Sequence, residues 1–202
     1  LEEGLVDTVL DTYEEIGERV VFSPMVFDIP AASMIHFRDD LPQEVQEMMG
    51  TGALEAKWQI EFLDAQIRRR PAGNNTHWAV GPFAPQRCSL ELLEGCADLA
   101  ERHDLGIYTH MYETRGQRVI ADQSFKEYGS SFVTYVDEAG MLNRRFNIAH
   151  SVWISREEMD RMAAAGAGVI LNHNSNYKLK SGIAPVLDLR DSGVRIGLGC
   201  DN

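Results

Sequence analysis

The stretch IYTHMYE at residues 107–113 contains the pattern that decides the fold. A short run with strand character ends at His110, and Glu113 follows three residues later. Three later runs end in polar residues in the same way, namely His150, Asn172 with His173, and Asp201. Because the carboxyl ends of parallel strands lie at one edge of a sheet, we expect these side chains to gather on one face of the protein.

Outward from this stretch, the chain alternates between short apolar runs and longer runs of helical periodicity. The apolar runs predict six strands, at residues 20–22, 78–80, 107–110, 147–150, 169–171 and 194–198. The periodic runs predict helices at residues 5–16, 42–49, 53–70, 90–102, 117–128, 133–137, 156–165 and 184–192. Strands that alternate with helices indicate βαβ units and a parallel sheet. Since residues 20–22 are all apolar, we expect that strand to be buried on both faces.

Two α/β architectures fit this alternation: an open doubly wound sheet and a closed (β/α) barrel. In a barrel, the reactive residues come from the carboxyl ends of several different strands. The positions of His110, His150 and Asp201 therefore favour a (β/α)8 TIM barrel. No linker, low-complexity tract or change in composition divides the chain, so we expect residues 1–202 to form one domain.

The composition is that of a globular chain with an excess of acid. The 202 residues include 31 acidic and 19 basic ones, for a formal charge of −12, which argues against binding to a nucleic-acid backbone. We interpret Arg68, Arg69 and Arg70 as the solvated, cationic end of a helix. No apolar run approaches the ~18 residues that a membrane span requires, and the first ten residues lack the basic side chains of a secretory signal.

Cysteine usage and charge together suggest the compartment of the protein and exclude some partners. Three cysteines without C-x-x-C spacing fit a reducing compartment better than a disulfide framework. We therefore expect a cytoplasmic protein, and we expect neither nucleic acid nor a membrane as a partner. The sequence leaves homo-oligomerisation open.

Histidine and carboxylate side chains at neighbouring strand ends suit a divalent metal ion. Imidazole nitrogen and carboxylate oxygen are good ligands for Zn²⁺ or Fe²⁺, and bound zinc lowers the pKa of its water from about 15.7 to roughly 7. A carboxylate just beyond such a ligand, as Glu113 is beyond His110, can carry a proton to a leaving group. Each residue alone has a plainer interpretation, because a strand-end histidine is more often structural, His173 can close a turn, and Asp201 can cap a helix. Their joint occurrence at strand ends favours the metal site.

Several segments resemble the amidohydrolase superfamily, in the branch of cytosine-deaminase-like, adenosylhomocysteine-deaminase-like and triazine-hydrolase (chlorohydrolase) enzymes. Residues 109–114, THMYET, resemble the H-x-x-E segment after the fifth barrel strand of that family. Similar segments follow in the family's order at residues 148–153, 172–179, 181–186 and 193–201, and residues 81–89 resemble the segment after the fourth strand. The resemblance extends from the first helix onward.

The resemblance implies a role for each matching residue. His110 and Asp201 would bind one divalent metal ion, zinc in preference to iron, and Asp201 would take a proton from the metal's water. Glu113 would carry protons to a ring nitrogen of the substrate, and His150 would hydrogen-bond the attacking hydroxide or the developing charge of the substrate. The implied reaction is attack of metal-bound hydroxide on a ring carbon of a small-molecule nitrogen heterocycle, with deamination as the leading expectation.

The resemblance also identifies substrate-binding positions and departures from the family pattern. Phe83, Gln86 and Asn172 are the expected substrate-binding residues, and Phe83 replaces a histidine that relatives often have. The family's first strand ends in H-x-H, which this sequence lacks, so His110 and Asp201 supply two of the three protein ligands usual in catalytic zinc sites.

We expect the chain to be an internal piece of a longer enzyme that contains barrel strands three to eight, without strands one and two and a flanking small β-domain. Three alternatives to this leading expectation stay open. A truncated barrel without catalytic activity is the first alternative. A chlorohydrolase or dealkylating aminohydrolase of the same branch is the second, and an open doubly wound sheet with an unrelated small-molecule site is the third.

Overall fold

The computed structural model describes every residue except 1, 35–37, 50–52, 74 and 202. The strands are β1 (Val20–Phe22), β2 (Met25–Val26), β3 (Thr76–Pro82), β4 (Gly106–Met111), β5 (Phe146–His150), β6 (Gly168–Leu171) and β7 (Arg195–Leu198). The α-helices are α1 (Glu3–Ile16), α2 (Gln43–Met49), α3 (Ala56–Arg69), α4 (Leu90–His103), α5 (Arg115–Ser124), α6 (Phe132–Glu138), α7 (Arg156–Ala164), α8 (His173–Lys178) and α9 (Val186–Ser192). Short 3-10 helices lie at η1 (Ala31–Met34), η2 (Arg38–Asp40), η3 (Pro85–Arg87) and η4 (Lys126–Tyr128).

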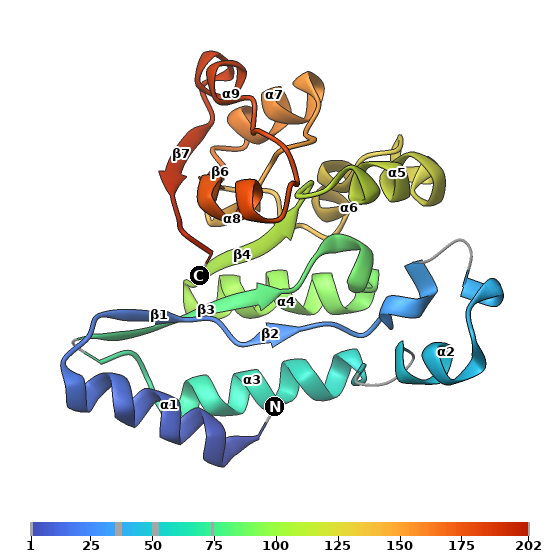
Figure 1. Cartoon of the computed structure of the whole chain (residues 1–202). Coiled ribbons are helices and arrows are strands. Elements are labelled where there is room, and N and C mark those ends of the chain that lie inside the picture. Colours follow the sequence, from blue (N-terminus) through green and yellow to red (C-terminus); the bar gives the residue numbers. More distant parts are fainter. Residues whose placement is uncertain (1, 35–37, 50–52, 74, 202) are drawn as a thin grey trace.

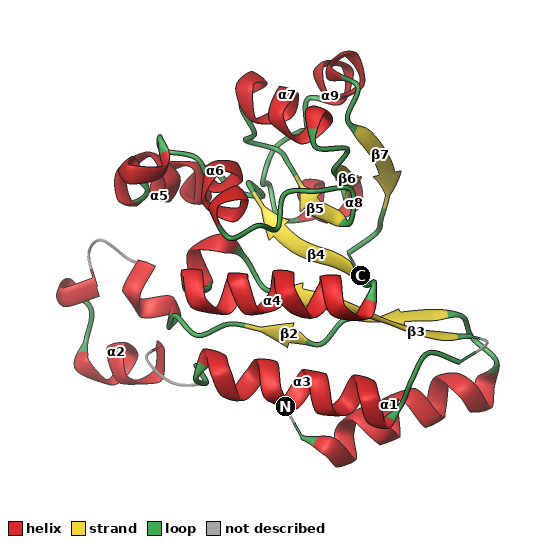
Figure 2. Cartoon of the chain, turned by 180° about the vertical axis from the view of Figure 1, so that it is seen from behind, coloured by secondary structure: helices red, strands yellow, loops and turns green. Residues whose placement is uncertain are grey.

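The strands form one parallel sheet whose spatial order follows the sequence (Figure 1). The order is β1-β3-β4-β5-β6-β7, and β2 continues the path of β1 along β3. Helix α4 lies behind β3 in Figure 1 and in front of it in Figure 2, and α3 packs beside α4. A doubly wound sheet would reverse its strand order and carry helices on both faces. The sheet is therefore part of a (β/α)8 barrel, as the sequence predicted.

The core lies between the sheet and the helices on its outer face. Along β4, Ile107 and Met111 are buried, whereas Tyr108 and His110 are half-buried, as expected for a strand whose alternate side chains face opposite sides. Helix α4 contributes a row of fully buried side chains: Leu92, Leu93, Cys96 and Leu99. Burial of one leucine side chain contributes about 1.5–3 kcal/mol. This packing fixes the strands and, with them, the positions of their carboxyl ends.

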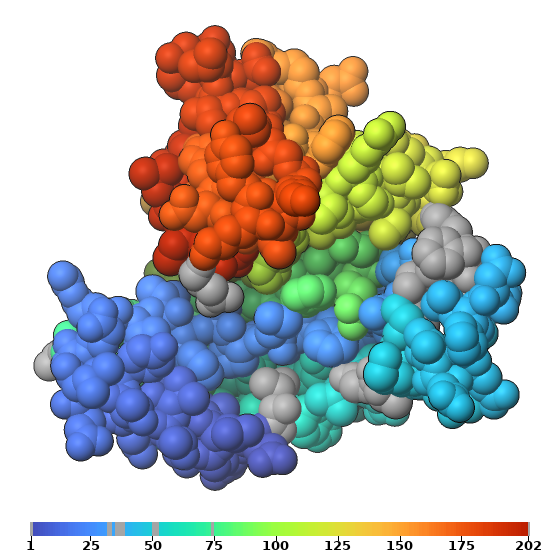
Figure 3. Space-filling model, viewed as in Figure 1, coloured from blue at the N-terminus to red at the C-terminus, as the bar shows by residue number. Residues whose placement is uncertain are grey.

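The expectation that residues 20–22 are buried on both faces is wrong. Val21 is 54% exposed, because β1 is the outermost strand of the sheet and pairs with β3 alone. β7 is the outermost strand at the opposite edge, and all four of its residues are exposed. In the space-filling view, the blue N-terminal segment and the red C-terminal segment occupy the lower and upper parts of the molecule (Figure 3).

One strand and one α-helix were not predicted from the sequence, and one predicted helix is divided into two. β2 was missed because it has only two residues, after Ser23 and Pro24 interrupt the strand. α8 was missed because its polar sequence lacks an apolar period, so His173 begins a helix and does not simply close a turn. The helix expected at residues 117–128 is α5 followed by η4, with the break at Phe125.

The arginine cluster at the end of α3 is a contact between helices. Arg69 and Arg70 both bind Asp7 of α1, at 2.8 and 3.0 Å, and Arg70 also binds Asp11 at 2.7 Å. The interpretation as a freely solvated helix end is therefore wrong for these two residues. None of the described helices combines the length and apolar character needed to cross a bilayer.

Candidate metal centre

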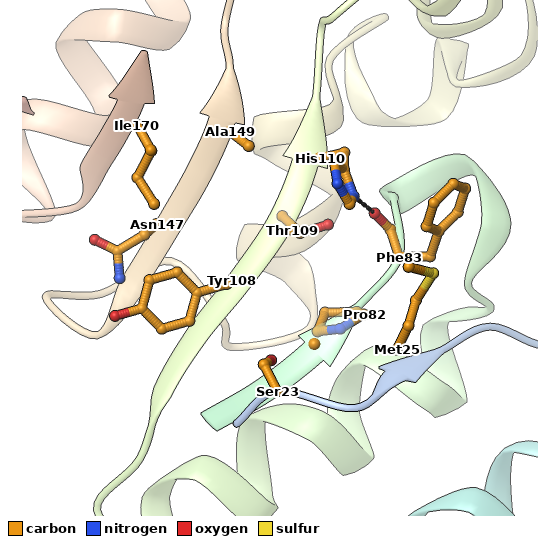
Figure 4. Close-up of a pocket in the computed structure, with 11 residues that line it drawn as sticks. Ser23, Met25, Pro82, Phe83, Tyr108, Thr109, His110, Asn147, Ala149 and Ile170 are labelled. Atoms are coloured by element: carbon orange, nitrogen blue, oxygen red, sulfur yellow. Dashed lines mark hydrogen bonds between the residues drawn. The ribbon is translucent and has the colours of Figure 1, made fainter. Parts of the chain in front are cut away.

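The inner face of the curled sheet lines a hollow of ≈ 170 Å³. Figure 4 shows Phe83 and His110 at the end of this hollow, and Tyr108 and Asn147 farther back along the strands. His110 thus belongs both to the hollow and to the group of polar side chains beyond the strand ends.

The imidazole of His110 is oriented by the neighbouring strand segment. Its Nδ1 donates a hydrogen bond to the main-chain oxygen of Phe83 at 2.8 Å (Figure 4). The same oxygen accepts the backbone N–H of His110 at 3.1 Å, and the Phe83 ring packs 5.2 Å from the His110 ring. With the proton on Nδ1, Nε2 carries the lone pair that a metal ion can bind.

His150 ends β5 and is almost completely buried. Its backbone is left-handed, with φ of 76°, which breaks the alternation of the strand at this residue. Nδ1 donates to Oδ1 of Asn176 at 2.9 Å, and the ring stacks 5.6 Å from that of His110. Nε2 is buried and has no hydrogen-bond partner among the described residues. A buried polar atom without a partner is costly, so this atom points to a missing ligand.

Asp201 reaches the site through a close approach of two strand ends. A Cβ atom on Gly199 would lie 2.4 Å from Oδ1 of Asn172, so only glycine allows this approach. Asp201 itself is left-handed, with φ of 54°. Its Oδ2 lies 3.7 Å from Nε2 of His150, and its side chain is about a quarter exposed (26%).

Glu113 lies close to the same imidazole nitrogen as Asp201. Its Oε2 lies 3.9 Å from Nε2 of His150, and its side chain is 20% exposed. The backbone N–H of Glu113 donates to Oε1 of Gln117 at 2.8 Å, and Thr114 caps α5. The carboxylate therefore lies beside His150 and keeps some access to solvent.

A buried network holds the segment that carries Glu113. Tyr112 precedes Glu113 with φ of 56°, and its hydroxyl donates to the buried Glu158 carboxylate. Glu158 also accepts from Arg118 at 3.0 Å, from Ser131 at 2.6 Å and from the backbone of Ser155 at 2.9 Å. Burial, followed by the Glu158 carboxylate, raises the pKa of Tyr112, so the tyrosine stays protonated as a donor.

The backbone adds a direct link between the two strand ends. The N–H of Ser151 donates to the oxygen of Met111 at 3.1 Å, and the N–H of Trp153 donates to that of Tyr112 at 3.0 Å. Two adjacent backbone hydrogen bonds therefore join the segments that follow His110 and His150.

Of the polar residues expected at the strand ends, the structure brings His110, His150 and Asp201 together. One ligand atom from each lies within 4.8 Å of the others, a separation that suits coordination of a single ion. Among the described residues, His173 does not belong to this group. His110 and Asp201 supply an imidazole nitrogen and a carboxylate oxygen, which suit zinc, and Nε2 of His150 lies close to both without a hydrogen-bond partner among the described residues. The residues present therefore fit a divalent metal ion.

The expected substrate-binding residues lie in three different settings. Phe83 lines the hollow beside His110. Gln86 is buried in η3, and its Oε1 has no hydrogen-bond partner among the described residues. Asn172 is buried beside Gly199, and its part in substrate binding stays a prediction.

Sequence reasoning missed the residues that support the site. Glu158 had a recognisable signal, because Ser155 and Glu158 form the S-x-x-E capping box at the start of α7. Asn176 and Tyr112 had no such sequence signal, because their hydrogen-bond partners lie 26 and 46 residues away in the sequence.

Comparisons with known proteins agree with this geometry. The model of the amidohydrolase family matches residues 3–202. The 5′-deoxyadenosine deaminase of Methanothermobacter thermautotrophicus is 41% identical over 61% of this chain, and the 5-methylthioadenosine/S-adenosylhomocysteine deaminase of Halothermothrix orenii is 37% identical over 60%. The chain spans 28% of the length of each. A zinc-bound adenosine deaminase structure from Xanthomonas campestris superposes with a TM-score of 0.70 at 24% identity, covering 94% of this chain and 38% of that one.

Proposed function

Because this chain belongs to the amidohydrolase family, we propose that it forms, as one barrel domain, the catalytic part of a metal-dependent hydrolase that deaminates an amino-substituted nitrogen heterocycle. The observation that carries the proposal is the convergence of His110, His150 and Asp201 within 4.8 Å, with Glu113 beside them. The chain covers 28% of two curated deaminases, so the activity of the whole protein is inferred from their names and from this site.

The metal site in this proposal uses His110 and Asp201 as ligands, with zinc as the expected ion. His110 suits this role because its Nδ1 is already bound to Phe83, which leaves Nε2 for the ion. When bound, such an ion lowers the pKa of a coordinated water to roughly 7 and so supplies a nucleophile at neutral pH. The support for zinc is the donor set and the zinc in the solved neighbour.

The remaining side chains of the site divide the proton transfers between them. Asp201 accepts a proton from the attacking water, since its Oδ2 lies on the side that faces His150. His150 keeps its proton on Nδ1 through Asn176, so Nε2 can accept a hydrogen bond from the nucleophile. Glu113, whose carboxylate lies 3.9 Å from Nε2 of His150, carries one of the water's two protons to the ring nitrogen. The other proton, accepted by Asp201, passes to the departing amine, which leaves as ammonia.

A purine nucleoside is the favoured substrate class. Both curated relatives described above are named as deaminases of adenosine derivatives, and Phe83 offers an aromatic face next to His110 on which a ring can stack. The exocyclic amine of an adenine ring would then leave as ammonia.

Ammonia release from a panel of heterocycles tests the proposal. The purified protein that carries this chain is assayed with adenosine derivatives, guanine, cytosine, pterins and chlorotriazines, after metal analysis and after reloading with zinc or iron. We expect zinc-dependent ammonia release from adenosine derivatives. Chloride release from the triazines in its place would favour the chlorohydrolase alternative, and metal binding without hydrolysis of any compound would contradict the proposal.

A further inference from the structure

The segment that follows β4 departs from the side-chain alternation of the strand. His110 lines the hollow (Figure 4), and Met111 belongs to the core. A strand that continued in this way would turn Tyr112 towards the hollow and Glu113 towards the helices. The structure has the opposite arrangement. Tyr112 is fully buried in the core, and Oε2 of Glu113 lies 3.9 Å from Nε2 of His150.

The backbone conformation of Tyr112 accounts for this exchange. Its φ of 56° is left-handed, outside the range of an extended strand, so the direction of the chain changes at this residue. An aromatic residue adopts this conformation at a cost in free energy, because its Cβ approaches the following carbonyl oxygen. Contacts elsewhere in the molecule must offset that cost if Glu113 is to stay beside His150.

The side chain of Tyr112 supplies such contacts, because it touches three helices. Its ring stacks on that of Phe132 in α6, with the ring centres 5.1 Å apart, and the guanidinium carbon of Arg118 in α5 lies 4.7 Å from the ring centre. Its hydroxyl donates to the carboxylate of Glu158 in α7 and accepts the backbone N–H of Phe132 at 2.8 Å. The tyrosine is therefore anchored through both its ring and its hydroxyl.

The acceptor of this anchor is itself held in place. Three further donors bind the Glu158 carboxylate, namely Arg118, Ser131 and the backbone of Ser155. A hydrogen bond to a buried, charged acceptor contributes a free energy comparable to the cost of one left-handed residue. Without the Tyr112 hydroxyl, an extended backbone would therefore compete with the left-handed one, and the carboxylate of Glu113 would move away from His150.

We propose that Tyr112 is a positioning residue, whose anchor on Glu158 holds the left-handed turn that brings Glu113 to the candidate metal site. The proposal rests on the proposed function, since it concerns the proton transfer by Glu113. Tyr112 is buried away from the hollow and acts through the place of its neighbour. A misplacement of a reacting group by about 1 Å lowers a rate by as much as about 10²-fold, so kcat should depend on this anchor.

Tyr112→Phe tests the anchor, because it removes the hydroxyl and keeps the ring that stacks on Phe132. We expect kcat for ammonia release by the zinc-loaded protein to fall at least about tenfold, with KM and zinc content each within about twofold. Glu158→Gln keeps an oxygen acceptor without the charge, so it should lower kcat by a smaller factor than Glu158→Ala does. Glu158→Gln also serves in place of Tyr112→Phe if that variant does not fold.

A Glu113→Gln background separates positioning from a general loss of structure. If Tyr112 acts through Glu113, Tyr112→Phe should lower kcat by less than about twofold once Glu113 is replaced. Tyr135→Phe is the matched control and should leave kcat unchanged, since Tyr135 is also buried and its hydroxyl donates to the backbone oxygen of Cys88 at 2.9 Å. An equal loss in both backgrounds, or no loss in either, would overturn the proposal.

Crystal structures of the unmodified and Tyr112→Phe proteins give a measurement that does not depend on activity. We expect the carboxylate of Glu113 to lie beside Nε2 of His150 in the unmodified protein and to be displaced by more than about 1 Å in the variant. A carboxylate that keeps its place in Tyr112→Phe would contradict the positioning role. Displacement in a protein that releases no ammonia from any compound would support the positioning role and contradict deamination.

Discussion

Replacement of Glu158 by alanine should be among the most destabilising single changes in this chain. The side chain is 3% exposed and accepts hydrogen bonds from Tyr112, Arg118, Ser131 and the backbone of Ser155. Removal of one partner of a buried ion pair costs about 3–5 kcal/mol, because the other charge stays in a poorly solvated position. We therefore expect the free energy of unfolding to fall by about 3–5 kcal/mol.

Tyr112→Phe should lower the free energy of unfolding by less than Glu158→Ala does, and the effects of the two changes should be coupled. It removes one hydrogen bond to a charged acceptor, worth about 1.5–3 kcal/mol, and it leaves the backbone N–H of Phe132 without its partner. Because Tyr112 and Glu158 share one network, the double variant should lose at least about 1 kcal/mol less than the sum of the single variants.

Urea denaturation followed by circular dichroism measures these losses. Glu157→Ala is the matched control, since Glu157 is the exposed neighbour of Glu158 in the first turn of α7 and should change stability by no more than about 0.5 kcal/mol. A loss below about 1 kcal/mol for Glu158→Ala, or additive losses in the double variant, would refute the reasoning.

Four further predictions concern the site and its surroundings. Glu113→Gln should lower kcat at least ~10²-fold while metal content, measured by mass spectrometry, stays unchanged; a parallel loss of metal would contradict its role in proton transfer. Asp201→Asn should lower zinc affinity at least about tenfold in equilibrium dialysis, and unchanged affinity would exclude it as a ligand. Gly199→Ala should destabilise the protein by about 1–3 kcal/mol in thermal unfolding, because the new Cβ would lie 2.4 Å from an amide oxygen. Burial raises the pKa of Asp64, but its hydrogen bonds, first of all the one from His103, lower the pKa by more than burial raises it. The resulting pKa is about 2. The ionised Asp64 therefore stabilises the fold above about pH 4, and this stabilisation is lost as the pH falls towards 2. Asp64→Asn should remove about 1–2 kcal/mol of this stabilisation, so the free energy of unfolding should vary less with pH between 4 and 2 than in the unmodified protein.

The strand-end residues could be predicted from the sequence, because parallel strands place their carboxyl ends together whatever the loops do. His110 and Asp201 needed no further information than the order of the strands. His150 was also expected there, but its left-handed backbone and its bond to Asn176 depend on a contact between β5 and α8. Local patterns do not encode such contacts.

The exposure of the strands at the edges of the sheet could not be predicted from the sequence, for a related reason. Val20, Val21 and Phe22 are apolar enough for a central strand, and burial was the natural expectation. Whether a strand is central or outermost depends on which neighbours pair with it, and β1 pairs with β3 alone.

The left-handed residues around the site have a consequence for engineering. Tyr112, His150, Ser151 and Asp201 all adopt φ between 54° and 76° at the strand ends, where a residue with a side chain pays roughly 1–2 kcal/mol. A selection for heat resistance alone would therefore favour glycine at these positions, yet glycine would remove His150 or Asp201 from the candidate metal site, or the Tyr112 hydroxyl that holds the segment of Glu113. Thermostable variants of this protein should be sought elsewhere in the barrel, under simultaneous selection for turnover.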